Sequence, residues 1–329
     1  MNHRTLGKTG INVSEISLGT WQVGGKWGEP FDHMLADEIL NTAVDQGVNF
    51  IDTADVYGDG NGESEQAVGR LVRSRSEQLY VASKCGRQLQ PHVNEAYTPE
   101  ALRAFVEASL KNMGLERIDL IQLHCPPTEV YYRPEIFELF ERLQEEGKIG
   151  HLGVSVEKVE EALKAIEFPN VTTVQVIFNL FRQRPAQLLF REAARRNVGI
   201  LARVPLASGL LTGKFGKDTT FGANDHRQFN RNGEVFDKGE TFSGLDYALG
   251  LEVVNDLQQI VPNRELVHVA LQWILNHPEV SCVIPGASKP AQVTNNLAAT
   301  TAAPLTETEV AQINALYEEK VKTQVHHLW

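Results

Sequence analysis

IDLIQLHCPPTEVYYRPEIFELFERLQEEGKIGHLGVS, the stretch from Ile118 to Ser155, predicts a strand, a helix and a second strand in that order. Its two ends, Ile118–His124 and Ile149–Ser155, are short runs rich in Ile, Leu and Val without strict alternation, which is typical of strands buried on both faces. Between them, Pro134–Glu146 has the spacing of an amphipathic helix, and proline is favoured in a first helical turn. A crossover this short implies that the two strands are parallel.

The same strand–helix pattern extends along the chain on both sides of this stretch. The other expected strands are Ile16–Gly19, Asn49–Asp52, Leu79–Lys84, Thr173–Ile177, Val198–Arg203 and Ser281–Ile284. The other expected helices are His33–Gln46, Glu63–Arg73, Pro99–Met113, Lys158–Ile166, Pro185–Arg196 and Pro290–Ala299. Eight parallel units of this kind account for a chain of 329 residues, so we predict an α/β fold, a (β/α)8 TIM barrel, as a single domain over residues 1–329.

An open, doubly wound sheet is the alternative for such an alternation. It would need a Gly-x-Gly-x-x-Gly turn after the first strand, but residues 19–25 (GTWQVGG) lack that spacing and no helix starts after them. The alternation stops at residues 205–244, a stretch rich in Gly, Asp, Asn and Phe that we predict to be a long functional loop. Helices are then expected over Leu245–Val261, Leu266–Asn276 and, after a capping box at residues 306–309, Glu307–Lys322.

The composition argues against several classes of partner. The formal net charge is −11, and an acidic surface repels phosphate backbones and anionic lipid, so we expect neither nucleic acid nor a membrane as a partner. The N-terminus lacks the pattern of a secretory signal. Three scattered cysteines, Cys85, Cys125 and Cys282, cannot pair fully and lack zinc-ligand spacing, so we expect no metal and a cytoplasmic location. The sequence gives no indication of oligomeric state.

Polar residues follow or end three neighbouring strands. Asp52, Lys84 and His124 end the second, third and fourth expected strands, and Tyr57 lies just beyond Asp52. In a parallel barrel the reactive groups lie at these carboxyl ends. Each residue alone has an ordinary structural explanation as a turn cap, a solvent-exposed lysine, a packing tyrosine or a hydrogen-bonded histidine. Together they form a proton-delivery set.

The chemistry of this set follows from electrostatics. An isolated tyrosine has a pKa of about 10, which is too high for efficient proton exchange near neutral pH. An ammonium about 4 Å from the phenol oxygen favours the phenolate by up to ~4 kcal/mol, and Lys84 would supply that charge while Asp52 keeps it ionised. His124 would hydrogen-bond the substrate oxygen. We therefore predict that Tyr57 protonates a carbonyl oxygen while a reduced nicotinamide delivers hydride to the carbon.

Several motifs resemble those of the aldo-keto reductase superfamily, in the form found in bacterial members. They are FIDTADVYG at residues 50–58, GESE at 62–65, VASK at 81–84 and DLIQLH at 119–124, and the likeness extends from residue 4 to the last strand. The resemblance implies reduction of aldehydes or ketones to alcohols. It also implies that Tyr57 is the general acid, with Asp52, Lys84 and His124 in the roles given above.

The resemblance further implies a set of cofactor contacts. Ser155 matches a serine that holds the nicotinamide carboxamide, although Val156 stands where asparagine is usual, and Gln175 matches the glutamine that completes the contact. Residues 202–214 resemble a pyrophosphate-binding loop, with Arg203 in place of an aromatic residue that stacks on the nicotinamide. The expected cofactor-binding residues are Gly19, Thr20, Trp21, Asp52, Ser155, Gln175, Arg203, Pro205, Leu206, Ser208, Gly209, Leu211, Gly213, Lys214, Gly286, Ser288, Lys289, Gln292, Asn295 and Asn296.

The cofactor type rests on the segment before the last barrel helix. Backbone N–H groups at that helix start suit a phosphate, and Lys289 would contact a 2′-phosphate unless it is simply an exposed lysine. Gln292 stands where some members have arginine, which weakens that argument. We predict NADPH as the cofactor, with NADH as the alternative.

The expected partner is a small-molecule carbonyl substrate. Its predicted contacts are Trp21, Trp27, Tyr57 and His124, and Tyr131 and Tyr132 either line the same apolar pocket or pack in the core. Two alternatives stay open. One is a regulatory or sensing subunit that binds the nicotinamide cofactor with little turnover. Val156 and Arg203, which depart from the cofactor contacts of the family, are compatible with it. The other is a barrel lyase or isomerase, which would need a Schiff-base lysine or metal-binding carboxylates.

Overall fold

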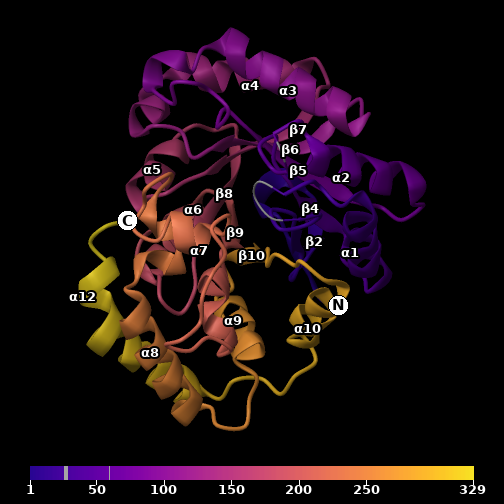
Figure 1. Ribbon diagram of the computed structural model, residues 1–329. Helices are drawn as coiled ribbons and strands as arrows, with labels where there is room; N and C mark the ends of the chain where they lie inside the picture. Colours follow the sequence, from indigo (N-terminus) through magenta and orange to yellow (C-terminus); the bar gives the residue numbers. More distant parts are fainter. Residues whose placement is uncertain (26–28, 59) are drawn as a thin grey trace.

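The computed structural model describes residues 1–25, 29–58 and 60–329. Trp27, one of the expected substrate contacts, lies outside the described residues. In the described part, eight parallel strands form one sheet in which neighbours follow chain order (Figure 1). The strands are β3 (Leu18–Gly19), β4 (Phe50–Asp52), β5 (Tyr80–Cys85), β6 (Ile118–His124), β7 (Ile149–Ser155), β8 (Val171–Ile177), β9 (Gly199–Arg203) and β10 (Val280–Val283).

The sheet closes on itself between its first and last strands. The N–H of Ser17 donates to the carbonyl of Val283 at 2.9 Å, and the N–H of Gly19 donates to the carbonyl of Pro285 at 3.1 Å. These parallel contacts confirm the predicted (β/α)8 barrel. The bounds of β6 and β7 coincide with the predicted ranges, and the bounds of the other strands agree with the prediction to within two residues.

An N-terminal hairpin, which the sequence pattern did not predict, closes one end of the barrel. Its strands β1 (His3–Thr5) and β2 (Asn12–Ser14) are antiparallel and only three residues long, too short to show alternation. Leu6 and Val13 pack against buried residues inside the barrel. At Gly7, where φ is +52°, a Cβ would lie 2.3 Å from the nitrogen of Gly199, so the hairpin fits tightly here. The opposite end therefore carries the opening.

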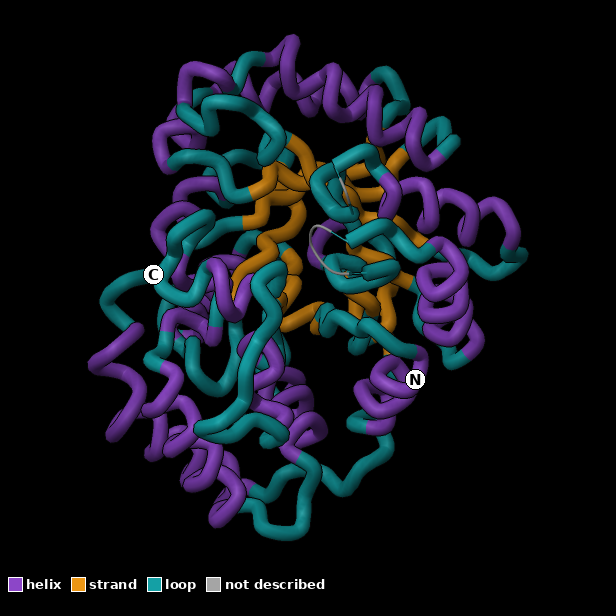
Figure 2. Tube along the Cα trace, viewed as in Figure 1, coloured by secondary structure: helices purple, strands orange, loops and turns teal. Residues whose placement is uncertain are grey.

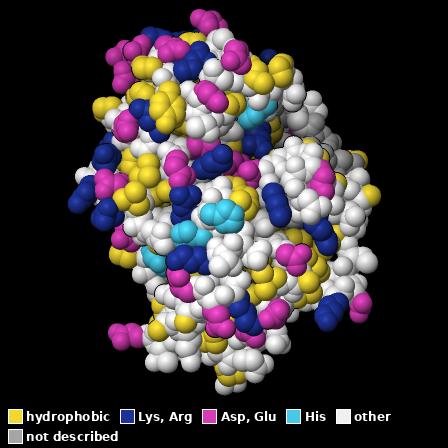
Figure 3. Space-filling view, turned by 90° about the vertical axis from the view of Figure 1, so that its left-hand side faces the viewer, with side chains coloured by type: hydrophobic (Ala, Val, Ile, Leu, Met, Phe, Trp, Pro, Cys, Tyr) yellow, Lys and Arg dark blue, Asp and Glu magenta, His cyan; other side chains and the backbone are white. Residues whose placement is uncertain are grey.

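Helices surround the strands on the outside (Figure 2). Those that follow barrel strands are α1 (His33–Asp45), α2 (Glu63–Ser74), α3 (Pro99–Met113), α4 (Pro134–Glu145), α5 (Val159–Ala165), α6 (Leu189–Arg195) and α10 (Pro290–Ala298). The predicted helix Pro185–Arg196 is split, because a separate 3-10 turn, Arg184–Ala186, precedes α6. On the face shown in Figure 3, acidic and basic side chains are interspersed, so the net negative charge is not gathered into one patch there.

The remaining helices are α8 (Tyr247–Ile260), α9 (Leu266–Leu275), α11 (Glu307–Leu316) and α12 (Lys322–Val325). The predicted capping box is present, because Thr306 and Glu309 bond to each other's backbone N–H. The predicted helix Glu307–Lys322 widens into a π-helical turn at Tyr317–Val321 before α12. No helix in the described part combines the length and apolar character of a membrane span.

The long segment 205–244 contains only short helical pieces, as its lack of periodicity predicts. They are α7 (His226–Phe229) and 3-10 turns at Ala207–Thr212, Lys238–Glu240 and Phe242–Gly244. Leu206, Phe236 and Glu240 of this segment line the same cavity as the carboxyl ends of the strands. The segment therefore forms part of the wall over the open end of the barrel.

Candidate active site

The four candidate catalytic residues converge at the open end of the barrel. Asp52 ends β4, Tyr57 lies in the loop after it, Lys84 is on β5 and His124 ends β6. The ammonium of Lys84 donates to the Asp52 carboxylate at 2.6 Å and to the Tyr57 hydroxyl at 3.2 Å. The rings of Tyr57 and His124 lie 6.1 Å apart between centroids and nearly perpendicular. The structure therefore brings together the four side chains that the strand-end pattern predicts.

Two glutamines inside the barrel hold Asp52 in place. The side-chain amides of Gln122 on β6 and Gln175 on β8 both donate to Asp52 Oδ1, at 3.1 and 2.8 Å. The backbone carbonyl of Thr53 accepts a further hydrogen bond from Lys84 at 2.9 Å. Gln175, which the family resemblance assigns to the nicotinamide, thus also orients the carboxylate. Gln122 was not predicted, although a polar residue between the apolar residues of a doubly buried strand is a signal for such a role.

The charges in this group follow from burial and pairing. Burial lowers the pKa of Lys84, but Asp52 and Tyr57 raise it by more, so this pKa is above its usual value and the ammonium is charged. Burial raises the pKa of Tyr57 and outweighs the opposing effect of Lys84. The lysine thus acts in the expected direction, but the net lowering expected from electrostatics alone does not occur, because desolvation is the larger effect. The phenol is protonated at neutral pH, as a proton donor must be.

His124 is neutral for the same kind of reason. Burial, followed by the positive charges of Lys84 and Arg87, holds the pKa of His124 well below its usual value. Its Nδ1 atom has no hydrogen-bond partner among the residues that the structure describes. A neutral imidazole can present one N–H donor to an oxygen in the cavity.

A cavity of about 1270 Å³ extends from these residues to the start of α10. The predicted cofactor residues that line it are Gly19, Thr20, Trp21, Asp52, Ser155, Gln175, Arg203, Pro205, Leu206, Ser208, Gly209, Lys214, Gly286, Ser288, Gln292, Asn295 and Asn296. Three others are not among the lining residues. Leu211 is buried in the hydrophobic core, Gly213 ends a 3-10 turn in the left-handed conformation, and Lys289 is exposed just before α10.

The aromatic residues divide differently from the prediction. Trp21 lines the cavity, as expected, with its ring 4.7 Å from that of His226. Tyr131 is fully buried in the core, while Tyr132 is 63% exposed, and neither lines the cavity. The idea that both tyrosines line an apolar pocket is therefore wrong, because one packs inward and the other faces solvent.

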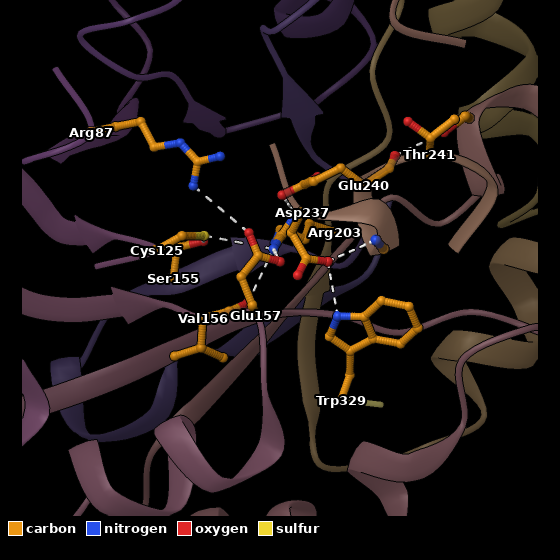
Figure 4. Close-up of polar contacts among 12 residues, drawn as sticks. Arg87, Cys125, Ser155, Val156, Glu157, Arg203, Asp237, Glu240, Thr241 and Trp329 are labelled. Carbon is orange, nitrogen blue, oxygen red and sulfur yellow. Dashed lines mark hydrogen bonds and ion pairs between the residues drawn. The ribbon is translucent and has the colours of Figure 1, made fainter. Parts of the chain in front are cut away.

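Three charged residues that the motifs did not identify, Arg87, Glu157 and Glu240, form one wall of the cavity together with Arg203. Figure 4 shows Arg203 between two carboxylates, and its guanidinium donates to Glu240 at 2.5 Å and to Glu157 at 3.0 Å. Arg87 lies 3.8 Å from the other oxygen of Glu157. The guanidinium that stands in place of the stacking aromatic residue is thus paired with two carboxylates. Glu157 follows the end of β7 by two residues, a position that could have marked it.

The two carboxylates differ in their protonation. Burial and the neighbouring Glu240 raise the pKa of Glu157 to about 7, against the opposing charge of Arg203. Burial also acts to raise the pKa of Glu240, but Arg203 and Arg87 outweigh it and hold this pKa below its usual value. Glu240 is therefore the carboxylate of this pair that is ionised at neutral pH.

The segment 205–244 is also held from outside by an aromatic side chain. The indole N–H of Trp329 donates to the carboxylate of Asp237 at 2.8 Å, and the guanidinium of Arg182 lies 3.9 Å above the indole ring. Asp237 lines the cavity, so this contact links a distant part of the chain to the cavity wall.

The chain belongs to the aldo/keto reductase family, whose model matches residues 15–318. Aldo-keto reductases are oxidoreductases that use nicotinamide cofactors, so the predicted class of enzyme is confirmed. The chain is 30% identical to the aldo-keto reductase YhdN of Bacillus subtilis, over 99% of this chain and 96% of that protein. It is 29% identical to an NADH-specific methylglyoxal reductase of Escherichia coli, over 89% of this chain and 92% of that protein.

Two further likenesses bear on the fold and on the alternative function. The solved structure of the glycerol dehydrogenase AKR11B4 from Gluconobacter oxydans superposes with a TM-score of 0.78 at 28% identity, covering 97% of this chain and 96% of that one. A probable voltage-gated potassium channel subunit beta of Oryza sativa is 26% identical, over 98% of each protein.

Proposed function

We propose that the protein reduces aldehydes or ketones to alcohols with NADPH, and that Tyr57 donates the proton. The observation that carries this proposal is the hydroxyl of Tyr57 at 3.2 Å from the buried ammonium of Lys84, at the cavity. A reduced nicotinamide supplies the hydride when bound. Tyr57 gives its proton to the carbonyl oxygen, Lys84 stabilises the phenolate left behind, and His124 donates a hydrogen bond to the same oxygen.

The residues around the cavity fit a dinucleotide. The N–H groups in the first turn of α10 suit a phosphate, and Ser288 and Gln292 of this region line the cavity. Lys214 adds a positive charge to the wall. We assign Ser155 to the nicotinamide carboxamide, residues 205–214 to the pyrophosphate and residues 286–296 to the adenosine end. Lys289 does not line the cavity, but it is exposed beside Ser288, which does, and on this position we base the choice of NADPH over NADH.

The test is turnover and nucleotide binding in the variant Tyr57→Phe. We expect its rate of 4-nitrobenzaldehyde reduction to be lower than that of the wild type by a factor of about 100 or more, because general acid catalysis is lost. It should still bind NADPH with unchanged affinity, as followed by the fluorescence of the nucleotide. Tyr132→Phe, at an exposed tyrosine away from the cavity, is the control and should retain full activity. Wild-type turnover by Tyr57→Phe would exclude the proposed mechanism.

The sensing-subunit alternative makes a different prediction for the wild-type protein. It requires tight nucleotide binding with negligible turnover on a broad panel of carbonyl compounds. The similarity to the rice channel subunit is the observation that favours this alternative. The complete set of Asp52, Tyr57, Lys84 and His124 favours catalysis instead. We further propose that residues 1–329 form one domain, since the cavity combines residues from Gly19 to Asn296. We also propose a cytoplasmic location, since the three cysteines are free and buried.

A further inference from the structure

The interior of the barrel changes from apolar to polar at the level of Asp52. Phe50 and Leu120, two residues before Asp52 and Gln122 on the same strands, belong to an apolar cluster that includes residues of the N-terminal hairpin. Asp52, Gln122 and Gln175 come from β4, β6 and β8, and the side chains of one interior layer of such a barrel come from alternate strands. These three residues therefore form a polar layer on the side of the apolar cluster that faces the open end.

Gln122 is the member of the polar layer that does not reach the cavity. Its side chain is fully buried, and it is not among the residues that line the cavity, whereas Asp52 and Gln175 are. Lys84 on β5 and Gly153 on β7 pair with it in register. At Gly153 a Cβ would lie 3.2 Å from Cγ of Gln122, so the glycine leaves room for the glutamine. A polar side chain enclosed in this way is costly unless it is hydrogen-bonded, so its contacts indicate its role.

The hydrogen bonds of Gln122 connect it to Asp52 and Gln175. Its amide N–H donates to Oδ1 of Asp52 at 3.1 Å, and its carbonyl oxygen accepts from the amide of Gln175 at 3.2 Å. Gln175 donates to the same Oδ1 atom at 2.8 Å, while the ammonium of Lys84 donates to Oδ2 at 2.6 Å. The two amides and the ammonium thus share in neutralising the charge of the carboxylate.

The charge on Asp52 in turn affects Tyr57. Burial raises the pKa of Tyr57, and of its charged neighbours Lys84 lowers this pKa while Asp52 raises it. The ammonium lies closer to Asp52, at 2.6 Å, than to the hydroxyl of Tyr57, at 3.2 Å. An amide that donates to Asp52 weakens the pull of the carboxylate on the ammonium. More of the positive charge then stabilises the phenolate that forms when Tyr57 gives up its proton.

We infer that Gln122 is a positioning residue that strengthens Tyr57 as a proton donor through Asp52, without contact with substrate or cofactor. This inference rests on the proposed carbonyl reduction and adds a residue to its proton-delivery set. Gln175 shares the bond to Asp52 but also lines the cavity, so a substitution there would change ligand binding as well. Gln122 is therefore the position at which the effect on proton donation can be measured separately.

The test is the variant Gln122→Met, which keeps about the same side-chain length and removes the amide. The rate of NADPH oxidation in a single turnover with 4-nitrobenzaldehyde should fall about 10-fold or more, the effect of losing one hydrogen bond to a charged group. A single turnover excludes product release from the measured rate. The Kd of NADPH and the aldehyde concentration that gives half the maximal rate should change by no more than about twofold, because Gln122 does not line the cavity.

A second measurement asks whether Gln122 acts through Asp52. In an Asp52→Asn background, Gln122→Met should lower the single-turnover rate by no more than about twofold, because the charge on which the amide acts is absent. A merely structural role would give the same loss in both backgrounds. Thr173→Val is the matched control, since this hydroxyl is also buried on β8 but has no hydrogen-bond partner among the described residues. It should keep the wild-type rate.

A wild-type single-turnover rate in Gln122→Met, or the same loss with and without the charge on Asp52, would overturn this inference and leave carbonyl reduction intact. So would an equal loss in Thr173→Val, because the rate would then respond to any change in the barrel interior. Failure of the wild type to oxidise NADPH with 4-nitrobenzaldehyde would instead overturn the proposed function and this inference with it.

Discussion

Lys84 and Asp52 form a buried ion pair in which the ammonium lies 2.6 Å from the carboxylate and both side chains are almost wholly enclosed. Removing one partner leaves the other charge uncompensated in the interior, so Asp52→Asn should lower the free energy of unfolding by about 3–5 kcal/mol. Urea titration measures this change. The double variant Asp52→Asn with Lys84→Met should be less destabilised than the sum of the single variants, because the two residues are coupled. Simple additivity would contradict the coupling.

Asp55 should make the stability of the protein depend on pH. It is buried, neither carboxyl oxygen has a hydrogen-bond partner in the described part, and burial together with Glu65 raises its pKa to about 8. Between its unfolded pKa of about 3.9 and its folded value, the folded state keeps a proton that the unfolded state loses. This group therefore lowers stability as pH rises, by up to about 1.4 kcal/mol per pH unit.

Asp55→Asn, which mimics the protonated carboxyl group, should remove that slope. Its urea midpoint should exceed that of the wild type by an amount that grows from pH 5 to pH 8. Asp218→Asn, at an exposed position in the segment 205–244, is the control and should follow the wild-type curve. Parallel curves for the wild type and Asp55→Asn would show that Asp55 does not hold its proton.

Lys289→Ala tests the choice of cofactor. If the exposed lysine beside Ser288 pairs with the 2′-phosphate, its loss removes a charge-assisted hydrogen bond, and the Kd of NADPH should rise about 10-fold or more. The Kd of NADH, which lacks this phosphate, should not change. Fluorescence titration with each nucleotide measures both values. Equal effects on the two nucleotides would point to a general loss of the site and not to phosphate recognition.

Trp329 should stabilise the cavity wall through Asp237. Trp329→Ala removes a buried ring and its N–H, and should cost about 3–5 kcal/mol of unfolding free energy and raise the KM of the carbonyl substrate. Trp329→Phe keeps most of the packing and loses the hydrogen bond, at a cost of about 1 kcal/mol. Urea titration and steady-state kinetics follow the two effects. A wild-type KM in Trp329→Ala would show that the indole contact has no influence on the cavity.

The parts of the fold that sequence predicted best are those with strong periodicity. Strands β6 and β7 are continuous apolar runs because both faces are buried, and their ends mark the carboxyl edge of the barrel. That is why His124 and Ser155 were placed correctly. The hairpin of β1 and β2 was missed because strands of three residues show no usable alternation.

The part of the site that was missed depends on chain folding over long distances. Glu240 lies in a segment without periodicity, and only the folded structure brings it 2.5 Å from Arg203, 37 positions earlier. The direction of the net pKa shift of Tyr57 could not be predicted from the sequence either, since it depends on whether burial outweighs the charge of Lys84. Local patterns identify strand ends, whereas burial and loop contacts follow from the complete barrel.

The hydrogen bond from Gln175 to Asp52 spans 123 positions of the chain. All four proton-transfer residues have been synthesised once His124 is added, yet Asp52 receives its second glutamine hydrogen bond only when β8 has joined the sheet. A fragment that ends before β8 would carry every reactive group and Gln122, but it would lack the side-chain amide of Gln175. The complete set of hydrogen bonds that orients Asp52 is thus formed late in biosynthesis, and a chain split after α5 would regain it only when its two pieces reassemble.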